Sequence, residues 1–514
     1  MRDDEDFFTM TGLTAAEAYV RRSVTHSTHS TQPPTSTSTH RHLASTMLPS
    51  PAELVARFLR ANGYTETLAR FIQEAGLSND AGSSSGAAVT LEKILEEKKT
   101  FDVSLNFEKL GLHDESEGWT TPAPTKPMVL STLPTRSNLL AVTALRLILP
   151  TKTEPQQYIA TTTADRRLNL IDPADPSLPL VHSFTAFQDS PILDVMVLKG
   201  KYLLTASMSG KLLLYDTVAE RILDERKDHS KFLVKLASWS DGTSAIVASA
   251  GWDAKVHLYR VRLDQDRIHQ LGEPIATLSL SSIPEAILFT QSPDTSSPVL
   301  VLTRRDSSFL YYYAVPVSDD DPRELILLGR QNLAPHSTAW VAFTPSDVQL
   351  CPVDPSLAAI ATSSTPHMKL IIVRLLVPPS GGSAADTLMR NLPQASGIIG
   401  EHVTQASQAR AQLLLQDREE AAISINVSTM APQTAYSTPK LAWRPTGSGV
   451  YVSSDDGIVR GFEAASGKLV ATLEAHQAGS KLRCLWAGRL TGHPEDECLL
   501  SGGFDQRLIL WRTA

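Results

Sequence analysis

Two stretches of the chain place histidine, serine and aspartate at similar spacing, and these are the residue types of a hydrolase triad. The residues are His229, Ser249 and Asp253 in one stretch and His476, Ser501 and Asp505 in the other. An enzyme needs its nucleophile once, so the recurrence argues against catalysis. We interpret the residues as a buried hydrogen-bond network inside each of two repeated units, where polar groups require partners.

Motifs of other chemistries are missing from the sequence. There is no glycine-rich phosphate loop after a strand, no G-x-S-x-G and no H-E-x-x-H. Four N-terminal histidines (His26, His29, His40 and His42) could hold a metal, but their polar surroundings favour a solvated, disordered tract. The sequence therefore predicts a protein that is not an enzyme and carries no metal or cofactor.

Charge and hydropathy limit the partners. The formal net charge is −8 and no basic stripe is visible, which argues against direct binding of nucleic acid. No apolar run is long enough to span a membrane, and the best candidate is interrupted by Arg374. The three cysteines (Cys351, Cys484 and Cys498) are expected to be small buried hydrophobes in a reducing compartment, cytoplasmic or nuclear.

From about residue 127 onward the chain repeats a unit of roughly 40 residues. The clearest copies end in "SAGWDAKVHLYRV" and "SGGFDQRLILWRT", and looser copies occur at Asp165, Ser209, Asp306, His367 and Asp456. An apolar strand precedes each copy, and several of these strands end in a polar turn. Seven such units predict an all-β, seven-bladed β-propeller over residues 127–514, because a lone blade would expose both faces.

Two features of this region are expected to depart from the regular four-stranded repeat. The last unit ends at Trp511 without an outer strand, so "MVLSTL" near residue 130 is predicted to complete that blade and close the ring. Residues 377–420 are predicted to be an insertion between blades five and six, with a helix in its second half. That helix is either a surface helix on the rim or a partner-binding element.

The repeats resemble the WD-repeat family over roughly three-quarters of the chain. The family places a His before the blade, a Ser on the second strand, an Asp in the next turn and an aromatic residue on the third strand. The matching residues are His229, Ser249, Asp253 and Tyr259 in one unit and His476, Ser501, Asp505 and Trp511 in another. Ser209 and His367 replace the Asp elsewhere, which weakens the assignment of blades four and five more than that of the ring itself.

Residues 1–47 form a polar, low-complexity segment that is predicted to be disordered. Met47 directly precedes the first expected element, so translation from Met1 and from Met47 are both open. Residues 50–76 predict two short helices around Asn62-Gly63, with Ser50 and Glu53 as a capping box and Thr65 as the cap of the second helix. Helices this short need a cover for their apolar stripe.

The segment "ELVARFLRANGYTETLARFIQE" resembles the LisH (lissencephaly-homology) motif, although the small residue after Thr is displaced by one position. The resemblance implies homodimerisation; docking onto the rest of the same chain is the alternative. The residues expected to pair the two copies are Leu54, Val55, Phe58, Leu59, Tyr64, Leu68, Phe71 and Ile72. After this motif we expect a flexible linker at 77–89, a helical extension at 90–112 and a Pro-rich joint at 113–126.

The turns that hold Asp253, Asp306 and Asp505 should gather on one face of the ring. That placement makes a candidate partner-binding face from Trp252, Arg304, Arg305 and Phe504. The sequence thus predicts a non-catalytic dimeric scaffold or adaptor that recruits protein partners through its propeller. The alternative is a substrate receptor or scaffold subunit of a ubiquitin ligase, although "YDTV" at 215–218 and "WRTA" at 511–514 both depart from the Trp-Asp-x-Arg box of such receptors.

Overall fold

The structure is a computed structural model that describes residues 51–83, 90–92, 118–150, 152–185, 187–242, 244–262, 267–316, 324–337, 339, 341–379, 405–490 and 496–513. It divides into two compact units, residues 1–100 and residues 101–514, which we describe separately. Residues 1–47 and most of the predicted extension at 90–112 lie outside the described residues.

The larger unit consists of seven antiparallel, four-stranded sheets in chain order. Blade 1 contains β2 (Leu139–Leu147), β3 (Gln156–Thr163), β4 (Leu168–Ile171) and β5 (Leu180–Phe184). Blade 2 contains β6 (Ile192–Leu198), β7 (Tyr202–Ser207), β8 (Leu212–Asp216) and β9 (Arg221–Arg226). Blade 3 contains β10 (Leu233–Ser240), β11 (Ser244–Gly251), β12 (Lys255–Arg262) and β13 (Ala276–Ser279).

The remaining blades follow the same order of strands. Blade 4 contains β14 (Pro284–Gln291), β15 (Pro298–Arg304), β16 (Phe309–Ala314) and β17 (Ile326–Asn332). Blade 5 contains β18 (Thr344–Leu350), β19 (Leu357–Ser363), β20 (His367–Arg374) and β21 (Ile423–Pro432). Blade 6 contains β22 (Leu441–Trp443), β23 (Gly449–Val452), β24 (Ile458–Glu463) and β25 (Leu469–Glu474). Blade 7 combines β26 (Leu482–Arg489), β27 (Glu497–Gly503), β28 (Leu508–Arg512) and β1 (Lys126–Val129).

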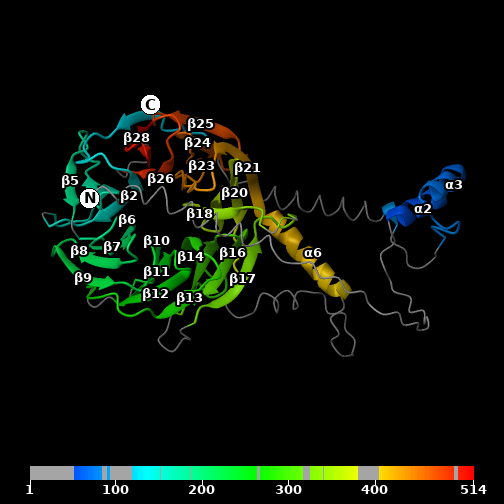
Figure 1. Cartoon of the computed structure of the whole chain (residues 1–514), viewed down its shortest axis with the longest axis horizontal. Helices are drawn as coiled ribbons and strands as arrows, with labels where there is room; N and C mark the ends of the chain where they lie inside the picture. Colours follow the sequence, from blue (N-terminus) through cyan, green and yellow to red (C-terminus); the bar gives the residue numbers. More distant parts are fainter. Residues whose placement is uncertain are drawn as a thin grey trace, which may run out of the picture. The chain divides into compact units, whose positions relative to one another are not determined.

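The sheets stand around a common axis with their first strands innermost, as Figure 1 shows. Each first strand contacts the first strand of the next blade, and β26 contacts β2, so the ring is closed. β1 pairs with β28 in antiparallel register, from Lys126 opposite Arg512 to Val129 opposite Ile509. The predicted seven-bladed propeller and its closure by an N-terminal strand are therefore confirmed.

The apolar core lies between blades. Seven buried clusters each draw residues from two neighbouring blades, and the seventh joins blade 7 to blade 1. Strands such as β7 and β27 are buried along their whole length, because both faces of each blade are covered. This burial explains why the repeats read as nearly continuous apolar runs.

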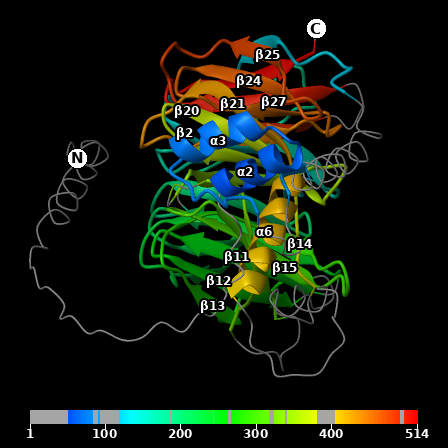
Figure 2. The same ribbon diagram turned by 90° about the vertical axis from the view of Figure 1, so that its right-hand side faces the viewer.

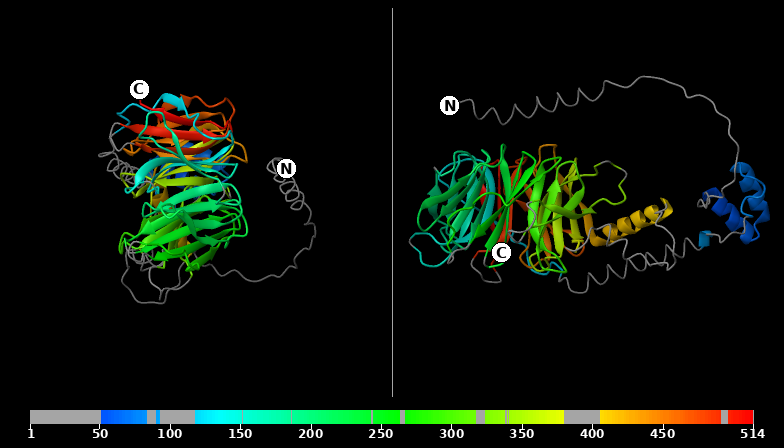
Figure 3. Two further views of the ribbon diagram at one scale, coloured as in Figure 1. Left: turned by 90° about the vertical axis from the view of Figure 1, so that its left-hand side faces the viewer. Right: turned by 90° about the horizontal axis from the view of Figure 1, so that it is seen from below.

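The insertion lies inside blade 5, which corrects the prediction that it falls between blades 5 and 6. Helix α6 (Gln405–Ala422) is continuous with β21, the outer strand of blade 5. Figures 2 and 3 show α6 leaving the side of the ring near blades 4 and 5. Its base is fixed where buried Glu419 accepts a 2.8 Å hydrogen bond from the Asn332 backbone N–H, and burial raises the pKa of this carboxyl group. The sequence does not reveal β21 as the outer strand of blade 5, because the long insertion separates β21 from the other three strands of that blade.

The segment predicted as a Pro-rich joint at 113–126 is packed on blades 6 and 7 from residue 118 onward. The Trp119 ring lies 4.3 Å from the Arg444 guanidinium and edge-on to Tyr451, and a Cβ at Gly449 would collide with it. Arg444 is fully buried and forms a bidentate pair with Glu497 at 2.7 and 2.6 Å. Arg444 also donates to the Thr121 hydroxyl at 2.7 Å, so the joint is an ordered part of the propeller.

The N-terminal unit holds helices α2 (Pro51–Ala61) and α3 (Thr65–Glu74), as the sequence predicts. Thr65 is the first residue of α3 rather than its cap, because Tyr64 occupies the N-cap position and makes no side-chain cap hydrogen bond. Gly63 has a φ of +75°, which suits a residue without a Cβ at the turn.

Part of the predicted linker at 77–89 is also ordered. Residues 77–83 fold back on α2, where Arg60 donates to the Ala81 carbonyl at 3.0 Å. A Cβ at Gly82 would lie 2.8 Å from the Arg57 backbone nitrogen, so glycine permits this close approach. Residues 84–89 lie outside the described residues.

We expect Trp119→Ala to lower the free energy of unfolding by about 2 kcal/mol, since a half-buried aromatic ring and its cation–π contact are lost. Urea unfolding of the full chain measures this change. The transition is followed by far-ultraviolet circular dichroism, because the substitution alters tryptophan fluorescence. Trp252→Ala is the matched control, because Trp252 is 38% exposed and should cost much less. Equal stability of the wild type and Trp119→Ala would contradict the packing described for the joint.

Candidate protein-interaction site

The two predicted polar networks exist and are buried. In blade 7, His476 Nδ1 bonds Asp505 Oδ2 at 2.8 Å and His476 Nε2 bonds Ser501 Oγ at 2.7 Å. Trp511 Nε1 donates to the same Ser501 oxygen at 2.8 Å. Burial opposes ionisation of Asp505, but the hydrogen bond and charge of His476 hold its pKa below the usual value.

Blade 3 repeats this geometry with one difference. His229 bonds Asp253 at 2.9 Å and Ser249 at 2.9 Å. The Tyr259 hydroxyl donates instead to Asp228 at 2.9 Å, so it does not occupy the role of Trp511. Ser249 and Ser501 are fully buried, so neither hydroxyl is open to a substrate, and the geometry favours a structural role for both networks.

The turns between second and third strands bring Trp252 and Arg305 together. The Arg305 guanidinium lies 5.9 Å from the Trp252 ring and bonds Glu285 at 2.7 Å. The Phe232 ring also packs against the Trp252 ring, and the two ring centroids lie 5.1 Å apart. We call Phe232, Trp252, Arg305 and Glu285 the Trp252 patch; it joins blades 3 and 4 and leaves Trp252 38% exposed.

The other two predicted face residues lie elsewhere. Arg304 turns back onto its own blade, where it lies 4.8 Å from the Tyr311 ring and donates to the Tyr311 hydroxyl at 2.8 Å. It is therefore a packing residue and not part of an open face. Phe504 is 39% exposed but stands on blade 7, where the Arg483 guanidinium lies 5.2 Å from its ring.

Sequence reasoning missed Tyr436, which is 64% exposed. Tyr436 lies in the loop that leads into blade 6, and the same loop is tied to blade 7 by a 3.0 Å hydrogen bond from Lys481 to Thr434. No repeat position marks this residue, because the loop between blades has no fixed spacing.

The predicted dimerisation residues fall into two groups. Leu68 and Ile72 are buried within one copy, together with Ala56 and Ala81. The others keep part of their surface exposed, and Tyr64 is the most open at 54%. They are Leu54, Val55, Phe58, Leu59, Phe71 and Tyr64. A core of four buried residues is small for an independent fold, which leaves a stripe available to a second helical pair.

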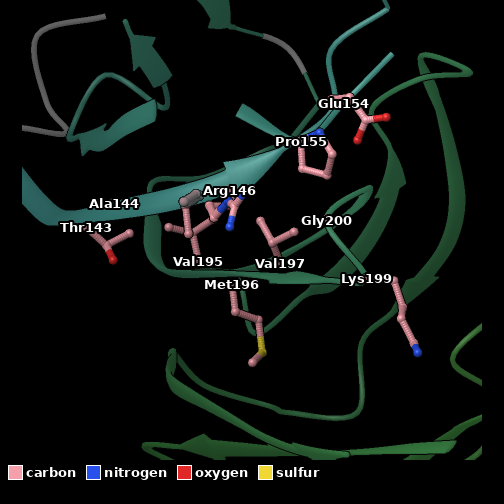
Figure 4. Close-up of a pocket in the computed structure, with 11 residues that line it drawn as sticks. Thr143, Ala144, Arg146, Glu154, Pro155, Val195, Met196, Val197, Lys199 and Gly200 are labelled. Atoms are coloured by element: carbon pink, nitrogen blue, oxygen red, sulfur yellow. The ribbon is translucent and has the colours of Figure 1, made fainter. Parts of the chain in front are cut away.

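A cavity of about 750 Å³ opens on the inner strands of blades 1 and 2. Figure 4 shows Arg146 on strand β2 and Val195 and Val197 on the neighbouring strand β6, with Glu154 and Lys199 toward one end of the cavity. The cavity is wide and shallow, and its lining lacks a nucleophile with an adjacent base. Within the described ranges, no group of three or more His, Cys, Asp or Glu side chains could hold a metal ion. No described helix is long and apolar enough to cross a membrane.

We expect Asp505→Ala to lower the free energy of unfolding by about 3 kcal/mol, because it leaves the buried His476 without its carboxylate partner. Urea unfolding of the full chain tests this value. Gln477→Ala is the control, since only the backbone N–H of Gln477 contacts Asp505. A mutant as stable as the control would show that the network does not stabilise blade 7.

Comparison with known proteins agrees with this architecture. A family model described as the UCP007778 beta-propeller domain matches residues 132–512, and one described as the UCP007778 LisH domain matches residues 53–78. No curated protein matches the sequence. Because the propeller match covers well over half of the chain and agrees with the observed ring, the chain belongs to the UCP007778 family, with a LisH domain ahead of a seven-bladed β-propeller.

Proposed function

We propose that the chain is a non-catalytic scaffold that forms a homodimer through its LisH domain and recruits other proteins through its propeller. The observation that carries this proposal is the partly exposed apolar stripe on a helical pair with a core of only four buried residues. A second copy would cover that stripe and produce a four-helix arrangement about a two-fold axis.

The propeller would supply the recruiting surface. The Trp252 patch combines an exposed aromatic ring with an arginine that Glu285 holds in place, and such residues are favoured anchors at interfaces. Two linked propellers would bind a repeated or dimeric partner more tightly than one, because the second contact becomes intramolecular.

We also propose that the ring is a WD-repeat propeller. The His–Ser–Asp networks of blades 3 and 7, and the addition of Trp511 in blade 7, support this classification. Their burial supports a non-catalytic role, since a substrate could not reach the serine hydroxyl groups.

Phe58→Asp should convert the full-length dimer to a monomer, because an unpaired carboxylate would have to be buried at the interface. Light scattering coupled to size exclusion measures the mass at a fixed protein concentration. Gln73→Asp introduces the same charge at an exposed site of α3 and should leave the dimer intact. An unchanged mass for Phe58→Asp would contradict pairing through this stripe.

Trp252→Ala should remove a subset of the proteins that co-purify with the tagged full-length chain, since the patch loses its central ring. Quantitative mass spectrometry of the wild type and the mutant measures the loss, which we expect to exceed about tenfold for a direct partner. Val353→Ala, at a position that is 63% exposed on the same propeller, is the control. Identical sets of proteins from all three would contradict recruitment by this patch.

A further inference from the structure

The outer strand of blade 6 has an open edge. β25 is the last strand of its sheet, and among the described residues no strand pairs with the side of β25 that faces away from β24. Figure 1 shows β25 on the rim of the ring. Alternate residues of an antiparallel strand direct their backbone N–H and C=O groups away from the neighbouring strand. The edge of β25 can therefore accept a further strand.

The beginning of this strand carries exposed apolar side chains. Leu469 and Val470 are the first two residues of β25, and they are 53% and 48% exposed. The pairing of β25 with β24 skips Val470, which is therefore a bulged residue. A strand laid along β25 would shield these side chains from water and give its outward backbone groups hydrogen-bond partners.

The chain enters the propeller next to this edge. The backbone N–H of Trp119 donates a 2.9 Å hydrogen bond to Glu463 Oε1, and Glu463 is the last residue of β24. The Glu463 backbone N–H in turn bonds the Lys468 carbonyl, across the turn that leads into β25. Residues 93–117 lie outside the described residues, and they join the propeller at this point. The C-terminal end of that segment is therefore fixed beside the start of β25.

Part of this segment has the sequence pattern of a strand. Residues 101–107 read FDVSLNF, so apolar and polar residues alternate without interruption. The apolar residues are Phe101, Val103, Leu105 and Phe107. A period of two is typical of a strand with one buried face, whereas the helical spacing of Leu91, Ile94 and Leu95 lies before this stretch.

The connection is long enough for this stretch to reach β25. Ten residues, 108–117, separate it from Gly118, and when extended they span up to about 33 Å. β25 has six residues, which corresponds to a length of about 20 Å. Gly118 itself lies against Glu463, since a Cβ at this position would be 3.0 Å from Glu463 Oε1. Residues 101–107 can therefore run antiparallel to β25 and return to Gly118 with length to spare.

We propose that residues 101–107 add to the open edge of β25 as a fifth, antiparallel strand of blade 6. The apolar side chains of this strand would cover Leu469 and Val470, and its backbone would pair with the outward N–H and C=O groups of β25. The chain would then hold both blade 6 and blade 7 by strand pairing before it enters blade 1. The proposal depends neither on dimerisation nor on recruitment by the Trp252 patch.

Hydrogen exchange of the full-length chain, measured by mass spectrometry of its peptides, tests this pairing. Peptides that cover residues 101–107 and β25 should both be protected in the wild type. The double substitution Val103→Asp and Leu105→Asp should speed exchange in the β25 peptide by about tenfold or more, because charges cannot be buried against its apolar side chains. Ser104→Asp with Asn106→Asp is the matched control, since it places the same charges on the polar face and should leave exchange unchanged.

The reciprocal substitution reports on the other partner. Val470→Asp should speed exchange at residues 101–107 by about tenfold or more, for the same reason. Ile326→Asp is its control, because Ile326 is a 54% exposed apolar residue on β17, the outer strand of blade 4. This control should leave residues 101–107 protected.

Three results would overturn the proposal. One is a wild type in which residues 101–107 exchange as fast as an unfolded peptide. Another is protection of these residues together with β25 exchange that Val103→Asp and Leu105→Asp leave unchanged, which would place the segment elsewhere. The third is protection that falls as the chain is diluted, which would assign the added strand to a second copy.

Discussion

The structure depends on the burial of apolar surface between neighbouring blades. Each sheet is apolar on both faces, so no blade has a core of its own and every cluster is shared by two blades. This constraint forces the ring to close, and the closing contact uses β1 from the N-terminal side of the propeller against β28 at the other end of the chain. Pairing with β1 also covers the edge of β28 and gives blade 7 a fourth, outer strand like those of the other blades.

The same constraint explains where polar groups are placed. Within a blade, the His–Ser–Asp networks satisfy buried donors and acceptors, and they fix the turn that follows the second strand. Between blades 6 and 7, Arg444 and Glu497 form a buried pair, and Arg444 also contacts Trp119 and Thr121. The N-terminal side of the propeller is thus secured by strand pairing and by a charged, aromatic contact next to it.

A rigid ring presents side chains without paying for their ordering at each binding event, which favours recognition by surface anchors. The Trp252 patch and the exposed Phe504 and Tyr436 stand on different blades.

The sequence by itself determined the features that repeat or lie close along the chain. The spacing of His476, Ser501 and Asp505 predicted their hydrogen bonds, the missing outer strand after Trp511 predicted the role of β1, and the Asn62-Gly63 turn predicted the helical pair. Each of these features follows from a short-range residue spacing or from one missing strand in a repeat, and both can be recognised in the sequence alone.

Only the tertiary structure decided the contacts that cross between blades. The inward path of Lys235 to Asp347 depends on the bulges in two strands and on a small residue in the blade between them. The inward turn of Arg304, the packing of Trp119 and the position of the insertion inside blade 5 depend in the same way on neighbours far along the chain. No spacing encodes such contacts, because closure of the ring brings together residues whose separation in sequence carries no period.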